Sequence, residues 1–123
     1  MIIAFGDYDD DFIDFPKDLS VMKVIFPDLS PHSIPETDYG KVLPEAKEIA
    51  AFVNKSVKAD KNIICQCEYG ISRSSGLAAA IMEHYKKEGI KVFSDYRYMP
   101  NKFVFNKVLA QLRILKRKEM GLI

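Results

Sequence analysis

The stretch Asn62-Ile-Ile-Cys-Gln-Cys-Glu-Tyr-Gly-Ile-Ser-Arg-Ser-Ser-Gly76 decides the fold of this chain. Its first six residues form a short, nearly continuous apolar run, which is typical of a central strand covered on both faces. Apolar residues at helical spacing begin near Ser74 and continue through Tyr85, and Gly89 ends this predicted helix. A strand followed directly by a helix leaves residues 67–74 as a tight loop between them.

Patterns on either side of this stretch predict the remaining elements. Apolar, β-branched runs indicate strands at residues 2–5 and 21–26. Pro and small polar residues predict a long exposed loop at 28–40, and helical spacing predicts helices from Pro44 to about residue 57 and at 101–118. Strands that alternate with helices favour an α/β fold with a central, mostly parallel sheet flanked by helices. At 123 residues, we expect a single domain over residues 1–123.

Charge and composition exclude several classes of function. Lys and Arg number 18 against 17 Asp and Glu, so no overall field attracts nucleic acid or a membrane. No apolar run approaches the ~20 residues of a membrane helix, and the opening stretch ends at Gly6, unlike a secretory signal. Cys65 and Cys67 are too close in sequence for an ordinary disulfide. We therefore expect a cytoplasmic protein, and the sequence leaves its oligomeric state open.

An acidic segment between Asp7 and Asp14 is the one candidate for a metal site. It contains five Asp residues, but Phe12 stands at the sixth position, where a calcium loop of the EF-hand type needs Gly. We expect a solvated acidic loop here, and neither a metal nor a cofactor.

The loop between the predicted strand and helix has the features of a phosphate-binding site. Backbone N–H groups of a loop entering a helix point at one spot, where the helix dipole adds positive potential. Gly70 permits the tight curl, and the planar fork of Arg73 can bind two phosphate oxygens. The predicted phosphate-binding residues are Glu68, Tyr69, Gly70, Ile71, Ser72 and Arg73.

The same positive environment stabilises a thiolate at Cys67. Cysteines in such settings have pKa values of roughly 3.5–7.5, against about 8.5 when free. The thiolate of Cys67 would attack phosphorus and form a phosphocysteine intermediate. The Ser74 hydroxyl would donate to the sulfur and help it leave when water cleaves that intermediate.

Residues 64–76 resemble the signature loop of the cysteine-dependent protein tyrosine and dual-specificity phosphatases. From about Val21 to Gln111 the chain is similar to the small bacterial predicted tyrosine phosphatases, whose Gly-Ile-Ser-Arg-Ser loop, alanine-rich helix and Tyr-x-Pro-Asn segment match residues 70–74, 77–80 and 98–101. This resemblance implies a phosphotyrosine protein phosphatase II-like fold. It also implies a phosphorylated protein or peptide as substrate, most naturally with phosphotyrosine, or a small phosphomonoester. The family usually has His before the cysteine, where this chain has Gln66.

The leaving oxygen needs a proton, and relatives supply it from an Asp after an upstream strand. Phe26-Pro27-Asp28 resembles their Trp-Pro-Asp loop, so Asp28 is the first candidate for the general acid and Asp38 the second. Arg97, Tyr98 and Asn101 lie in the segment that resembles the family's Tyr-x-Pro-Asn piece and are candidates to brace the loop.

Two other functions remain open at this point. Gln66 motivates a catalytically weak module that binds phosphate or a phosphopeptide. A rhodanese-type sulfurtransferase or arsenate reductase also places a cysteine in an anion-binding loop. For Cys65 we expect a small core residue, and for His32 either simple exposure or a place near the substrate.

Overall fold

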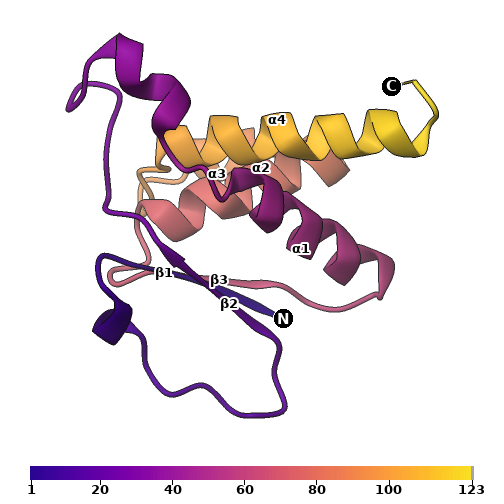
Figure 1. Cartoon of the computed structure of the whole chain (residues 1–123), viewed down its shortest axis with the longest axis horizontal. Helices are drawn as coiled ribbons and strands as arrows, with labels where there is room; N and C mark the ends of the chain where they lie inside the picture. Colours follow the sequence, from indigo (N-terminus) through magenta and orange to yellow (C-terminus); the bar gives the residue numbers. More distant parts are fainter. Residues whose placement is uncertain (123) are drawn as a thin grey trace.

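The computed structural model describes residues 1–122 and has a three-stranded sheet at its base (Figure 1). The strands are β1 (Ile2–Gly6), β2 (Val21–Ile25) and β3 (Ile64–Gln66), in the order β2-β1-β3. Both pairings are parallel, and Ile2 lies opposite Val21 on one side and Ile64 on the other. The α/β prediction with a parallel sheet flanked by helices is confirmed.

The central strand of this sheet is β1, and the prediction that residues 62–67 form the central strand is wrong. All five residues of β1 are buried, whereas β3 lies at the edge of the sheet and leaves Ile64 57% exposed. β1 pairs on both edges, and the Phe12 ring lies against Gly6 at its end. An apolar run does not by itself distinguish a strand with two neighbours from a strand with one.

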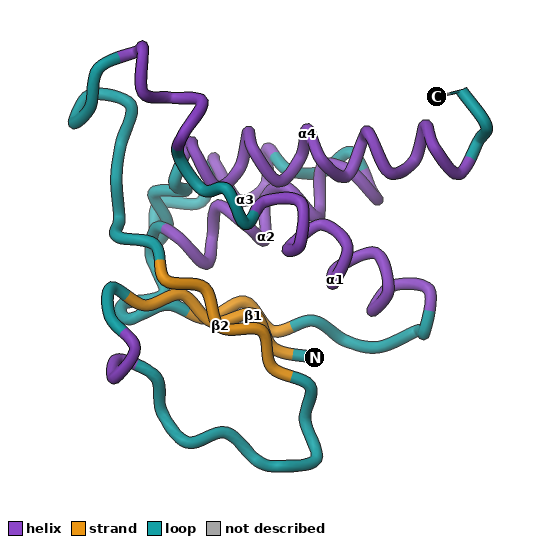
Figure 2. Tube along the Cα trace, in the orientation of Figure 1, coloured by secondary structure: helices purple, strands orange, loops and turns teal. Residues whose placement is uncertain are grey.

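Over residues 1–122, four α-helices lie on one face of the sheet (Figures 1 and 2). The second helix ends at Lys86, and Lys87 caps it with a left-handed φ of 57°. Gly89 therefore does not end this helix and instead precedes a short helix that the sequence pattern missed. Two 3-10 segments were missed as well. The helical elements are η1 (Asp9–Asp11), η2 (Glu36–Lys41), α1 (Ala46–Lys58), α2 (Arg73–Lys86), α3 (Ile90–Phe93) and α4 (Lys102–Glu119).

The core lies between the sheet and the helices. Ile3 and Phe5 of β1 meet apolar side chains from α1, α2 and α4, which repeat at helical spacing. Fully buried helical members are Ile49 and Val53 of α1, Leu77 of α2, and Val104, Val108 and Leu112 of α4.

The parallel arrangement determines where a site can form. Because the three strands run in the same direction, the segments that follow them all start at the carboxyl ends of the strands, on one side of the sheet. Asp7, Phe26 and Cys67 are the first residues beyond β1, β2 and β3. None of the helices within residues 1–122 combines the length and apolar character that crossing a bilayer demands.

Candidate active site

The loop from Cys67 to the start of α2 curls around one point. Cys67 is buried at its base, and Gly70 adopts φ 67°, a backbone conformation that residues with a Cβ rarely adopt. The segment before α4 holds the loop from outside, since Met99 N–H donates to Ile71 O at 3.0 Å and Asn101 N–H donates to Ser72 O at 2.9 Å. The loop is therefore fixed by both the sheet and α4.

The sulfur of Cys67 lies against the first turn of α2. Its Sγ is 3.2 Å from Ser74 Oγ, and Ser74 N–H donates to the same sulfur at 3.5 Å. Burial raises the pKa of Cys67, but the hydroxyl of Ser74 and the backbone N–H groups of Ser74, Gly70 and Ser72 together lower this pKa below its ordinary value. These hydrogen bonds stabilise the thiolate.

Cys65 occupies the opposite kind of environment. It packs against the core, and burial together with the nearby charge of Cys67 raises the pKa of Cys65 to about 12. Both cysteines are free thiols. The expectation of a core role for Cys65 is confirmed.

The guanidinium of Arg73 is buried and held from one side. Its Nη1 donates to Asp7 Oδ1 at 2.6 Å and to Phe26 O at 2.7 Å. Within residues 1–122, Nε has no hydrogen-bond partner, although buried donors nearly always have one. Nε therefore still has a hydrogen bond to donate, and Arg73 lines the pocket that contains Cys67.

Asp7 is a site residue that the sequence interpretation missed. It was expected in a solvated acidic loop, but its carboxylate forms the ion pair with Arg73. The signal was present in the sequence, because Asp7 directly follows a buried strand, at the sheet edge where the loop also begins.

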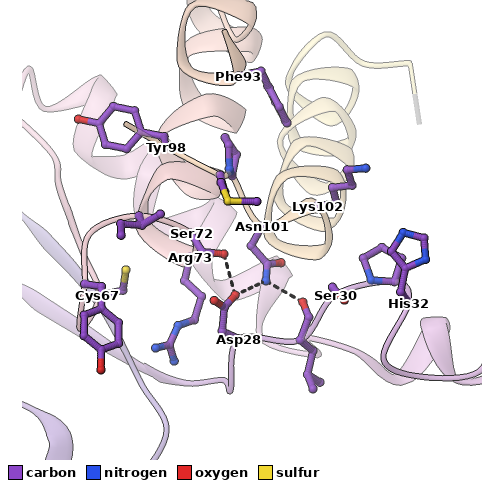
Figure 3. A pocket seen from close by; sticks show the side chains of 16 residues that line it. Asp28, Ser30, His32, Cys67, Ser72, Arg73, Phe93, Tyr98, Asn101 and Lys102 are labelled. Atoms are coloured by element: carbon purple, nitrogen blue, oxygen red, sulfur yellow. Dashed lines mark hydrogen bonds between the residues drawn. The ribbon is translucent and has the colours of Figure 1, made fainter. Parts of the chain in front are cut away.

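Asp28 is bound over the loop by two donors. Ser72 Oγ and Asn101 Nδ2 both donate to Asp28 Oδ1, at 2.7 and 2.8 Å (Figure 3). Asn101 is 5% exposed, and it also donates to Leu29 O and accepts from Val104 N–H as the N-cap of α4. One amide thus connects the acid segment to α4.

The rival carboxylate lies elsewhere. Asp38 belongs to η2, where it lies 3.7 Å from Lys41 Nζ, and it does not line the pocket that contains Cys67. The structure therefore brings Asp28 to the loop and leaves Asp38 outside.

A pocket of about 600 Å³ opens over Cys67. Its chemistry-bearing groups are Cys67, Ser72, Arg73 and Asp28, and most of its remaining wall is apolar. Phe93, Met99 and Lys102 had not been predicted here, whereas His32 is both exposed and part of the wall. The apolar and aromatic lining consists of Leu29, Pro31, Tyr69, Ile71, Phe93, Tyr98, Met99 and Pro100.

Glu68 and Gln66 face a different cavity. They line a space of about 210 Å³ together with Phe12 and Asp11, beside the outer face of the sheet. The predicted contribution of Glu68 to phosphate binding can therefore come from its backbone only. Within residues 1–122, the side chain of Gln66 forms no hydrogen bond that would brace the loop.

Compared by sequence, the chain matches no family profile and no curated protein. Compared by structure, it is similar to the human tyrosine phosphatase-like serine/threonine/tyrosine-interacting protein, with a TM-score of 0.62 and 14% identity over 94% of this chain and 77% of the other. It is also similar to DUSP15, with a TM-score of 0.62 and 15% identity over 99% of this chain and 78% of the other. The chain has the fold of these phosphatase-like proteins, as the signature loop predicted.

Proposed function

We propose that this protein hydrolyses phosphomonoesters through a phosphocysteine intermediate on Cys67. The proposal rests on one observation, which is that three groups line the same pocket. They are Cys67 with its lowered pKa, the guanidinium of Arg73 with its unpaired Nε, and the carboxylate of Asp28. A phosphate in the loop would receive hydrogen bonds from backbone N–H groups and from the free side of Arg73. The fold shared with phosphatase-like proteins agrees with this reaction.

In the first half-reaction, the thiolate of Cys67 attacks phosphorus and a sulfur–phosphorus bond forms. The bond from phosphorus to the leaving oxygen breaks, and Asp28 in its protonated form gives that oxygen its proton. Arg73 and the loop N–H groups stabilise the charge that develops on the other phosphate oxygens.

In the second half-reaction, water attacks phosphorus and Asp28, now a carboxylate, accepts the proton of that water. The sulfur–phosphorus bond breaks and inorganic phosphate forms. The Ser74 hydroxyl, 3.2 Å from Sγ, donates to the departing thiolate and lowers the cost of its release.

The pocket wall favours an aromatic leaving group. Ile71, Tyr98 and Met99 offer apolar surface beside the loop, which suits the ring of phosphotyrosine on a protein or peptide.

The test is hydrolysis of p-nitrophenyl phosphate by the intact protein and three variants across pH. Cys67→Ser abolishes turnover. Asp28→Asn lowers kcat by about 10²–10⁴-fold and removes the fall in rate on the basic side of the profile. Asp38→Asn, the matched control, keeps the intact rate and profile.

Two outcomes would overturn the assignment of roles. A full rate in both Asp variants excludes Asp28 and Asp38 as the acid for this substrate. Loss of the basic-side control in Asp38→Asn alone moves the acid to that residue.

A binding module is the second candidate function. Gln66 leaves the loop without the charged brace that the resembling family has, and one similar structure is named an interacting protein that is phosphatase-like. Tight phosphopeptide binding by the intact protein without turnover supports this candidate. Turnover that disappears in Cys67→Ser excludes it.

A further inference from the structure

The pocket extends well beyond the loop that would hold phosphate. Its volume of about 600 Å³ falls within the range of sites that enclose a whole small ligand. In Figure 3, Cys67 and Arg73 lie on one side of the pocket and His32 and Lys102 on the other, with Asp28 and Asn101 between them. A substrate held by its phosphate has further groups that extend toward the second side.

The second side carries a cation that is unpaired within the described part of the chain. Lys102 is the first residue of α4, is exposed and lines the pocket. Within residues 1–122 its ammonium forms neither an ion pair nor a hydrogen bond, whereas the other pocket cation, Arg73, is paired with Asp7. His32 adds ring nitrogen donors or acceptors to this side of the wall.

Among the described residues, one carboxylate lines this wall, and one of its two oxygens is already bound. Asp28 lines the same pocket, but its Oδ1 accepts hydrogen bonds from Ser72 and Asn101. Lys102 is therefore left to interact with a group that the substrate brings.

We propose that Lys102, assisted by His32, binds a second anionic group and makes the protein prefer phosphopeptides with acidic residues beside the phosphorylated side chain. The proposal rests on the proposed function for the chemistry at Cys67, but it concerns the opposite end of the pocket.

The experiment uses two phosphotyrosyl peptides that differ only in having Glu or Gln on both sides of the phosphotyrosine. The intact protein shows a kcat/KM about two- to five-fold higher for the Glu peptide at low salt, the effect of one exposed ion pair. This ratio declines as salt screens the pair. Lys102→Gln brings the ratio to about one, and His32→Gln brings it part of the way.

Lys118→Gln is the matched control, because it removes the same charge about 24 Å farther along α4. A preference that falls equally in Lys118→Gln and Lys102→Gln reflects the overall field of the protein and overturns the proposal. An unchanged preference for the Glu peptide in Lys102→Gln also overturns the proposal.

Peptide binding tests the role of Lys102 independently of turnover. If the intact protein turns over neither peptide, the proposed function fails, and the same Glu-to-Gln comparison is made on dissociation constants with Cys67→Ser. A dissociation constant about two- to five-fold lower for the Glu peptide supports the role of Lys102 if adding Lys102→Gln removes the difference. Equal dissociation constants, or no binding of either peptide, overturn it.

Discussion

Two thiols two positions apart have their pKa values displaced in opposite directions. Both are desolvated, but only Cys67 receives hydrogen bonds from Ser74 and the loop backbone, so its pKa is lowered. The pKa of Cys65 rises to about 12 because burial is not compensated there. The candidate nucleophile is therefore distinguished by donors within hydrogen-bond distance and not by burial.

Replacing Ser74 by Ala removes the hydroxyl 3.2 Å from this sulfur. Because the hydroxyl favours the thiolate, the pKa of Cys67 rises and the midpoint of alkylation by iodoacetamide moves to higher pH. Below the midpoint, alkylation is about three- to ten-fold slower than in the intact protein, as expected for the net contribution of one ordinary hydrogen bond. Cys67→Ser abolishes the fast alkylation and identifies the thiol. An unchanged midpoint in Ser74→Ala would contradict the role of the hydroxyl.

Asp7→Asn tests whether the ion pair aligns Arg73 for an oxyanion. The amide retains an acceptor near Nη1 but loses the charge that holds the guanidinium at 2.6 Å. We expect phosphate to bind about three- to ten-fold more weakly, measured as its inhibition constant against p-nitrophenyl phosphate.

Asp9→Asn, in the same acidic segment, is the control and leaves this constant unchanged, because Asp9 is exposed and forms no contact with Arg73. Equal inhibition constants in Asp7→Asn and the intact protein would show that Phe26 O alone positions the guanidinium.

At the scale of elements, α2 and the start of α4 approach each other closely at Gly76. A Cβ at this position would lie 2.6 Å from Asn101 O and 3.0 Å from Asn101 N. The same Asn101 caps α4 and holds Asp28, so the distance between these helices also determines the position of the candidate acid.

Gly76→Ala therefore forces the two segments apart. We expect a loss of about 1–3 kcal/mol in the free energy of unfolding, seen as a lower urea midpoint with an unchanged slope. Turnover at saturating substrate falls as well, because Asp28 moves with Asn101. Gly40→Ala is the control, since an added Cβ there meets nothing within 4 Å, and it changes stability by no more than about 0.5 kcal/mol. Similar losses in the two variants would refute the close-approach argument.

At the scale of the molecule, local patterns in the sequence predicted most of the elements but not their positions in the sheet. Helical spacing located α1, α2 and α4, and the Cys67–Ser74 spacing located the loop. The placement of β1 at the centre depends on which strands pair, and pairing is a long-range property that periodicity does not contain.

The residues of the candidate site likewise fall into those that a local motif predicts and those that only the fold brings together. Cys67, Arg73 and Ser74 lie within one local motif, so the sequence alone identified them. Asp7 lies 60 positions before Cys67 and Lys102 lies 28 positions after Ser74, and only the folded chain brings Asp7 to Arg73 and Lys102 to the pocket. Resemblance favoured Asp28 over Asp38, and the hydrogen bonds to Ser72 and Asn101 place it at the loop.

Since the site is assembled from segments across the chain, an anion in the loop should stabilise the whole fold. Inorganic phosphate at a hundred times its dissociation constant adds about 2.7 kcal/mol, a rise in Tm on the order of 10 °C for a domain of this size. Chloride at equal ionic strength gives no such rise. In Arg73→Met, phosphate no longer raises the Tm of the variant, because the buried guanidinium is lost. Arg113 is an exposed residue of α4, so Arg113→Met retains the rise. Equal increments in both variants would show that phosphate acts elsewhere than in the Cys67 loop.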